Sequence, residues 1–276
     1  MSTAAAAPTK AAIEDSTEAV VAMHEAFWDK QINRANELAE HSAANELLIF
    51  YASVLSAQRE IYELLGKHDG DVDVALLSDS MPLLLKAIEQ TASPQLSSEM
   101  QTLRTAAPGD ISKMLLEYAN HRLPTHFFAK ALFQPYGYWC WQNNRKPFGA
   151  KTPASERNCP ECGGLPQVSV RVASDSADGG SRNLLCATCL YEWSYRRVAC
   201  ASCGEEAPAK LAYFKAEQFA HIKIEICETC RRYVKSVDLT ELGNASPLVD
   251  DVGSASLDLW ALEREYTKLE INLVGL

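Results

Sequence analysis

The fold of this chain depends on four short segments, Cys159-Pro-Glu-Cys162, Cys186-Ala-Thr-Cys189, Cys200-Ala-Ser-Cys203 and Cys227-Glu-Thr-Cys230. Each segment is a Cys-x-x-Cys pair, and 23 residues separate the first pair from the second and the third from the fourth. Every cysteine of the first two pairs has a counterpart 41 residues later. A constant shift across four positions, without an insertion, indicates an internal duplication.

The Cys-x-x-Cys spacing allows two thiolates to converge on one metal ion, so two such pairs make a tetrahedral S₄ site for zinc or a single rubredoxin-type iron. The turn favours a residue with positive φ after the second cysteine; Gly163 and Gly204 meet this need, whereas Leu190 and Arg231 are less suited. Sequential pairing predicts two sites, and an interleaved arrangement is the alternative. The equal spacings favour two independent ribbons. The predicted metal ligands are Cys159, Cys162, Cys186 and Cys189 for one ion, and Cys200, Cys203, Cys227 and Cys230 for the other.

Disulfides are the competing use of nine cysteines. The chain has 276 residues, no secretory signal and no run of eighteen apolar residues, so a small secreted scaffold and a membrane protein are both disfavoured. We therefore expect reduced cysteines, metal binding and a cytoplasmic location, with no insertion into a membrane.

The charge distribution argues against a nucleic-acid partner. The net charge is −10, and residues 157–238, which contain the paired cysteines, carry only one more basic than acidic side chain. Eight thiolates with two divalent ions would make this region negative, whereas nucleic-acid binding requires a basic surface.

The first half of the chain has helical periodicity. Residues 1–14 read as a disordered tail, and Asp15-Ser-Thr-Glu18 has the form of a capping box. Residues 15–150 form the predicted helical domain, a bundle of six helices. The helices after the first are expected over about 44–66, 82–91, 94–106, 110–121 and 125–133, and Pro135 should break or kink the last of them.

After residue 150 the apolar period changes from 3.6 to 2, as in Val168, Val170 and Val172. We expect a first Cys₄ module over 158–198 and a second over 199–240, joined by a strand. Residues 250–276 should contain a C-terminal helix, about Ser256 to Ile271, which packs back on the body. The expected fold class is thus α+β: a helical bundle, two tandem rubredoxin-like (zinc-ribbon-like) modules and a final helix.

Other residues have ordinary interpretations. Cys140, between two tryptophans, is expected to be a buried thiol, His221 a surface residue, and Asp250-Asp251 a cap of the last helix. Two arginine pairs, Arg196-Arg197 and Arg231-Arg232, are expected to line a surface, with docking as one use of that surface. The sequence contains no catalytic triad and no phosphate-binding loop, so we expect no enzyme and no catalytic residue.

The cysteine-rich half closely resembles the FdhE family of formate dehydrogenase accessory proteins. The specific features are Glu192-Trp193 after the second pair, Arg197 before the third, and the ending Cys227-Glu-Thr-Cys230-Arg-Arg-Tyr233-Val-Lys235. The segments Phe50–Gln58 and Leu257–Trp260 are also similar, so the resemblance covers most of the chain.

This resemblance implies a helical part followed by two rubredoxin-like modules, with iron rather than zinc as the native metal. It further implies a chaperone-like role in maturing formate dehydrogenase before export, with the catalytic subunit of that enzyme as partner. An electron-transfer protein of rubredoxin type and a zinc-ribbon nucleic-acid-binding protein are the alternatives. The oligomeric state stays open, and a homodimer is among the alternatives.

Overall fold

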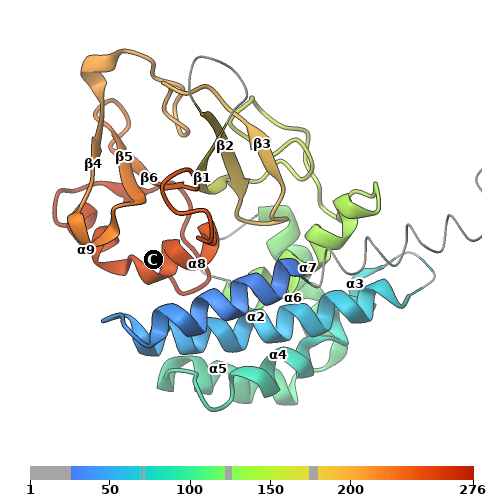
Figure 1. The fold of residues 1–276 in the computed structure, drawn as a ribbon. Coiled ribbons are helices and arrows are strands. Elements are labelled where there is room, and N and C mark those ends of the chain that lie inside the picture. Colours follow the sequence, from blue (N-terminus) through green and yellow to red (C-terminus); the bar gives the residue numbers. More distant parts are fainter. Residues whose placement is uncertain (1–25, 69, 71, 122–125, 174–179) are drawn as a thin grey trace, which may run out of the picture.

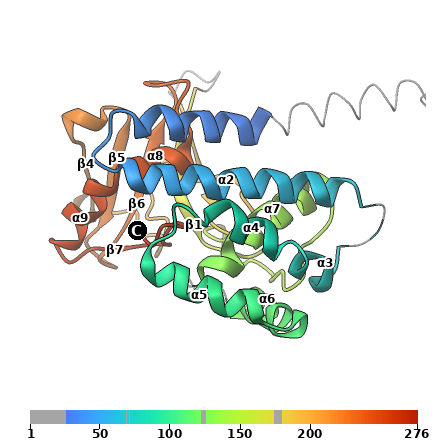
Figure 2. The same ribbon diagram turned by 90° about the horizontal axis from the view of Figure 1, so that it is seen from below.

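The computed structural model describes residues 26–68, 70, 72–121, 126–173 and 180–276, and in it a layer of helices lies against one β-sheet (Figure 1, Figure 2). The tail predicted over 1–14 and the capping box predicted at Asp15 to Glu18 lie outside these residues. The helical layer contains a helix through residues 26–39, α2 (Asn45–Gly66), α3 (Val74–Ser78), α4 (Met81–Ile88), α5 (Pro94–Thr105), α6 (Pro108–His121) and α7 (Phe127–Gln142).

The helix starts follow the local sequence. Asp73 precedes α3, and its side chain accepts a hydrogen bond from the Leu76 backbone N at 2.9 Å. Ser93 precedes α5 and accepts in the same way from the Leu96 backbone N at 3.3 Å, with Pro94 as the first helical residue. Since these side chains satisfy backbone donors that the first turn leaves unpaired, the helices begin where caps and prolines predict.

Helix α7 departs from its prediction, because it continues through Pro135 to Gln142 instead of breaking there. A proline has no N–H, so the carbonyl of Ala131, four residues earlier, loses its helical donor. The Gln58 side chain of α2 replaces this donor: its Nε2 donates to Ala131 O at 2.9 Å and to Gln134 Oε1 at 2.9 Å. The contact between α2 and α7 thus makes the proline tolerable.

Both cysteine-rich segments contribute to one sheet with the strand order β3-β2-β1-β6-β5-β4. Neighbours in this order are antiparallel except for β1 and β6, which are parallel and pair Val168 with Lys235. A short β7 pairs with the start of β6. The strands are β1 (Pro166–Val172), β2 (Ser181–Cys186), β3 (Glu192–Ser194), β4 (Leu211–Phe214), β5 (Ile222–Cys227), β6 (Arg232–Asp238) and β7 (Thr267–Lys268).

The two ribbons are therefore not independent, and that part of the prediction is wrong. Each three-stranded ribbon alone would expose the backbone of its outer strands, and unpaired strand edges readily pair with other strands. Here the edge of β1 is satisfied by β6 of the other copy. The duplication is joined through backbone hydrogen bonds between its two halves.

The C-terminal region also differs from the single helix predicted over 256–271. It forms α8 (Pro247–Gly253) and α9 (Ala255–Leu262), and then β7. Glu265 has a φ of 61°, and the backbone N of Tyr266 donates to Ala261 O at 3.0 Å, which is a Schellman-type helix end. This turn redirects the chain so that β7 can pair with β6. The segment packs on the body as expected, but as two short helices and a strand.

The two faces of the sheet have different surroundings. Val168 and Val170 of β1 share one buried core with α2, α7 and α8, so the helical layer and the sheet are not separate folding units. Alternation along β6 places Tyr233, Lys235 and Val237 on this helix-covered face. The opposite face presents Arg232, Val234 and Ser236. This second face is called the open face of the sheet.

Candidate metal centres

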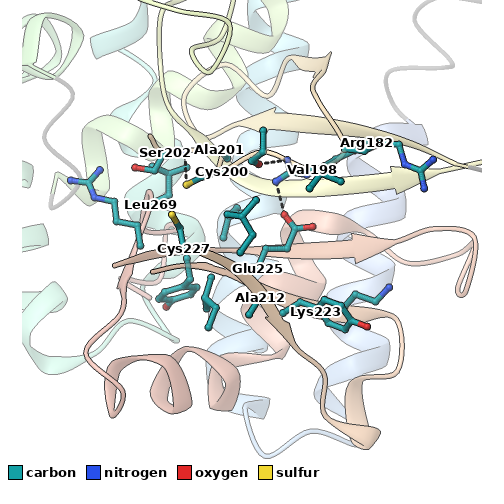
Figure 3. A pocket seen from close by; sticks show the side chains of 18 of the residues that line it. Arg182, Val198, Cys200, Ala201, Ser202, Ala212, Lys223, Glu225, Cys227 and Leu269 are labelled. Carbon is teal, nitrogen blue, oxygen red and sulfur yellow. Dashed lines mark hydrogen bonds and ion pairs between the residues drawn. The ribbon is translucent and has the colours of Figure 1, made fainter. Parts of the chain in front are cut away.

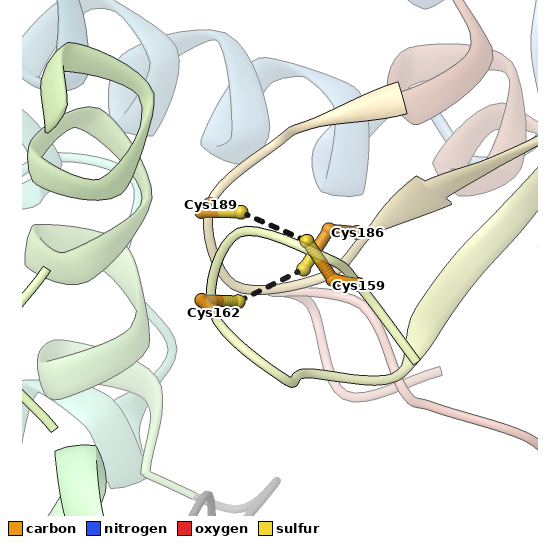
Figure 4. A group of neighbouring side chains, drawn as sticks. All are labelled: Cys159, Cys162, Cys186 and Cys189. Atoms are coloured by element: carbon orange, nitrogen blue, oxygen red, sulfur yellow. Dashed lines mark hydrogen bonds between the residues drawn. The ribbon is translucent and has the colours of Figure 1, made fainter. Parts of the chain in front are cut away.

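The first predicted site is assembled and buried (Figure 4). Four sulfur atoms, from Cys159, Cys162, Cys186 and Cys189, lie within 4.8 Å of one another, and all four residues have an exposed fraction of 0%. The Sγ atoms of Cys159 and Cys189 are 3.5 Å apart, as are those of Cys162 and Cys186. These separations far exceed a disulfide bond of about 2.05 Å.

The second site has the same pairing but is more open to solvent. Its four predicted ligands are Cys200, Cys203, Cys227 and Cys230, whose sulfur atoms also lie within 4.8 Å of one another. The Sγ separations are 3.7 Å for Cys200 to Cys230 and for Cys203 to Cys227. Cys203 is exposed and Cys230 is half-buried. The sequential pairing is confirmed, and the interleaved alternative is wrong.

The turn after each Cys-x-x-Cys pair has the same backbone conformation in all four places. The φ angles are 74° at Gly163, 80° at Gly204, 58° at Leu190 and 55° at Arg231. In three of the turns this residue donates its backbone N–H to the carbonyl of the first cysteine, at 2.8 Å for Gly163. The left-handed conformation is thus needed even where the residue is not glycine, at a cost of about 1 kcal/mol or more.

Sulfur geometry and electrostatics both fit a metal ion. Tetrahedral coordination with metal–sulfur bonds of about 2.3 Å requires sulfur atoms about 3.8 Å apart, close to the distances here. Burial raises the pKa of Cys189 well above its usual range, and it raises the pKa of Cys200 to about 12. Four thiolates so close together need a cation to offset their charge. With four cysteines each, the sites leave no coordination position for a substrate.

Helix α7 lies directly on the first site. The Gln134 side chain donates to Ala187 O at 2.9 Å, and the Trp141 indole N–H donates to Cys189 O at 2.9 Å. Between them, Gly137 approaches so closely that an added Cβ would lie 2.7 Å from the Cβ of Cys189. These three residues are one helical face, spaced by three and four positions. Sequence reasoning did not identify them.

The residues that carry the family resemblance hold the sheet on the helices. Lys235 is fully buried, with its Nζ 2.6 Å from Asp258 Oδ2 and 2.9 Å from Asp251 Oδ1. The Tyr233 hydroxyl donates to Asp258 at 2.8 Å, and Lys268 Nζ lies 2.7 Å from Asp251. Near the first site, the Trp193 indole donates to Glu156 O at 3.0 Å. A buried ion-pair cluster explains the Tyr233-x-Lys235 pattern.

The structure differs from two predictions about single residues near this ion-pair cluster. His221 is half-buried rather than on the surface, and its Nε2 lies 2.8 Å from Asp250 Oδ1. Asp250 also pairs with Arg34 at 2.8 Å and accepts from the backbone N of Ser246, which precedes α8. Asp250 therefore lies inside α8 and accepts from the residue before that helix, instead of capping the last helix as predicted, while Asp251 pairs with buried lysines. These partners are far apart in the sequence, so the sequence pattern did not predict their contacts.

Cys140 is buried in α7 with 1% of its surface exposed, as expected. Burial raises the pKa of its thiol to about 12, so it is a poor nucleophile and metal ligand at neutral pH. Of the second arginine pair, Arg232 lines a groove on the open face of the sheet, where Arg197 of the first pair also lies. Among the described helices, none is long and apolar enough to cross a membrane.

Comparison with known proteins agrees with this arrangement. Family models for the central and the C-terminal domain of FdhE match residues 158–197 and 198–274. A "Protein FdhE homolog" from Aquifex aeolicus is 30% identical over 200 residues, which cover 70% of this chain and 68% of the relative. Another, from Pectobacterium atrosepticum, is 26% identical over 274 residues, with 89% and 86% covered.

The fold is also found in a solved structure. The crystal structure of the FdhE protein from Pseudomonas aeruginosa has a TM-score of 0.69 and 23% identity, covering 91% of this chain and 96% of that one. A helical layer joined to one sheet with two Cys₄ centres defines a class of metal-binding proteins without an open metal position. The chain belongs to the FdhE family, the formate dehydrogenase accessory proteins.

Proposed function

We propose that this chain is a chaperone-like accessory protein that binds the catalytic subunit of formate dehydrogenase in the cytoplasm and is needed for its maturation before export. Membership in the FdhE family is the observation that carries the proposal. The chemistry of the site supports it, because both centres are closed by four cysteines and are suited to holding structure. A binding role therefore fits better than catalysis.

We further propose that each Cys₄ centre holds one metal ion and that the eight paired cysteines are the ligands. Tetrahedral sulfur coordination suits both zinc and a single iron. We favour iron because of the family, with zinc as the alternative. Elemental analysis and an absorption spectrum of protein purified without oxygen would decide this point: iron–thiolate charge-transfer bands would support iron, and a colourless protein with two zinc ions would contradict it.

The closed centres suggest what the metals do for binding. An ion at the first site joins the strand ends and turns that α7 packs against, and an ion at the second site joins the ends of β5 and β6 to the turn at Cys200. Metal binding would therefore stabilise the surface that a partner contacts, since structural metal sites contribute directly to folding.

The test is recovery of the enzyme subunit from cells. A tagged version of this chain should co-purify with the catalytic subunit of formate dehydrogenase, and a strain lacking the chain should lose formate dehydrogenase activity. The Cys200→Ser and Cys227→Ser double variant, made in the full chain, should capture less. Full enzyme activity in the deletion strain together with no co-purification would refute the proposal.

A second candidate function is electron transfer, favoured by one observation. Cys203 of the second site is exposed, so an iron there would lie near the surface, where electrons can pass to a partner. This function requires a reversible Fe(III)/Fe(II) couple. Voltammetry of protein from native cells that detects only redox-silent zinc would exclude it.

A further inference from the structure

The open face of the sheet has a groove that the metal centres do not account for (Figure 3). It has a volume of about 360 Å³ and lies between the loop at 197–202 and strands β1, β2, β4, β5 and β6. Two large apolar side chains are unusually exposed here, Val198 at 61% and Tyr213 at 70%. Exposed apolar groups in a concave, charged site are typical of a binding surface.

The groove is basic in a chain that is otherwise acidic. Five cationic side chains line it and one carboxylate, Glu225, does so. Four thiolates and a divalent ion at the second metal site add about −2 at one end, which still leaves the lining positive, whereas the whole chain has a net charge of −10. The lining cations are Arg171, Arg182, Arg197, Lys223 and Arg232.

Two of these cations already converge on the Glu225 carboxylate, and this argues against a small anion as the ligand. Arg182 is buried and donates to Ser169, to two backbone carbonyls and to Glu225. Arg171 lies 3.4 Å from the same Glu225. Lys223 has a long ion pair, 3.8 Å from Asp238, and its Nζ lies 5.7 Å from the centre of the Tyr213 ring, while within the described residues the Arg232 guanidinium has no acidic partner. Lys223 and Arg232 are thus the cations available to a ligand.

The register of the sheet sets the distance between these two. Lys223 pairs with Ser236 of β6, and Arg232 pairs with Cys227 of β5. Residues 232 and 236 are four positions apart on one face of β6, which corresponds to about 13 Å along the strand. Figure 3 shows Cys227 and Lys223 toward opposite ends of the groove, with Val198 and Glu225 between them. The available charges therefore lie at the two ends and the apolar groups lie between.

We propose that this groove binds an extended, acidic segment of a client polypeptide. In an extended peptide, side chains i, i+2 and i+4 point the same way, and i and i+4 are also about 13 Å apart. An acid-x-apolar-x-acid segment would place its two carboxylates at Lys223 and Arg232 and its apolar side chain against Val198. The inference rests on the proposed function only in taking the client to be a polypeptide. A single exposed ring, Tyr213, is a poor stacking surface for nucleic acid.

The direct test uses the full, metal-loaded chain and a fluorescein-labelled peptide, Gly-Ser-Glu-Thr-Val-Thr-Glu-Ser-Gly, with a second peptide in which lysines replace both glutamates. The acidic peptide should bind, more weakly as salt rises, and the basic one should not. Lys223→Glu and Arg232→Glu should each weaken binding about tenfold or more, because a carboxylate then faces a like charge. Lys223→Arg should retain binding.

The matched control is Lys113→Glu, an exposed position on α6 with the same change in net charge. It should bind the acidic peptide within about twofold of the unmodified chain, since distant surface charges are screened. All variants are compared only where circular dichroism and metal content match the unmodified chain. Lack of binding, binding unaffected by both reversals, displacement by inorganic phosphate at equal ionic strength, or tighter binding of single-stranded RNA would overturn the inference.

Co-purification separates the inference from the proposed function. If the unmodified chain captures the catalytic subunit and both reversal variants capture it equally well, the groove is not the docking site and the inference fails alone. If the acidic peptide binds as expected but the subunit is never captured, the proposed client is wrong while the peptide site stands.

Discussion

The contact between α7 and the first metal site makes an unusual prediction for Gly137→Ala. In most helices this change is stabilising, by about 0.5–1 kcal/mol, because glycine loses more conformational freedom on folding. Here the added Cβ would lie 2.7 Å from the Cβ and 2.8 Å from the Cα of Cys189, where normal contacts exceed 3.4 Å. The Cα is backbone, so it cannot rotate out of the way. The helix and the turn must separate.

The magnitude follows from what that separation disturbs. Overpacking of a closely packed site costs about 1–3 kcal/mol. The hydrogen bonds from Gln134 to Ala187 O and from Trp141 to Cys189 O flank the clash, and each contributes about 0.5–1.5 kcal/mol. We expect Gly137→Ala to lower the free energy of unfolding by about 2–6 kcal/mol, the sum of these terms. Metal should also leave the first site more readily.

Urea unfolding at a fixed metal concentration measures this change, with Gly109→Ala as the control. Gly109 is also helical, in α6, but nothing lies within 4 Å of an added Cβ there. The control should therefore be neutral or slightly stabilised. The reasoning would be refuted if Gly137→Ala unfolded at the same urea concentration as the unmodified chain or at a higher one.

Four further outcomes are expected. A chelator in excess should remove the metal of the second site quickly and that of the first site slowly, because Cys203 of the second site is exposed while the first site is buried. Elemental analysis should find one metal fewer after Cys→Ser at any of the eight paired positions, and both metals in Cys140→Ser. Lys235→Met should cost about 3–5 kcal/mol in urea unfolding, because the buried carboxylates of Asp251 and Asp258 then share Lys268 as their one described cation, whereas the exposed Lys113→Met should cost less than about 0.5 kcal/mol.

The fourth outcome concerns acid. Burial alone would raise the pKa of Asp250, but hydrogen bonds with His221 and Arg34 outweigh it and lower that pKa. Because the folded pKa is depressed, the stabilisation is complete above the ordinary value of about 3.9 and is lost as the pH falls through the folded pKa. The urea concentration at the midpoint of unfolding should thus decrease as the pH is lowered below about 4. Asp250→Asn should make this midpoint less dependent on pH.

Local signals in the sequence predicted much of the fold. The cysteine spacing identified both groups of four cysteines and their pairing, because a site made of Cys-x-x-Cys pairs depends mainly on local turns. Prolines and caps placed the starts of α4, α5 and α6 within a residue or two. The alternation of Val168 and Val170, and of Ile222 and Ile224, identified β1 and β5. In each case the deciding interactions lie within a few residues.

Long-range partners account for what was missed. Pro135 was expected to break or kink α7, and only the position of Gln58, 77 residues earlier, explains why the helix continues past it. The parallel pairing of β1 with β6 joins two segments that look self-sufficient in the sequence. His221 seemed a surface residue because Asp250 and Arg34, its companions in the ion-pair cluster, are 29 and 187 positions away. The periodicity of apolar residues along the sequence does not predict such long-range contacts.

The duplication conceals a difference in surroundings between its two copies. Equal spacing predicts equal sites, and the sulfur geometry is indeed alike, at 3.5 and 3.7 Å. What differs is the surroundings: Gln134, Gly137 and Trp141 cover the first site, while the second ends a groove open to solvent. Because a covered site can anchor the fold but cannot reach a partner, the two copies are suited to different tasks. Gly137→Ala should therefore lower the free energy of unfolding, whereas Arg232→Glu should weaken binding of the acidic peptide and leave that free energy unchanged.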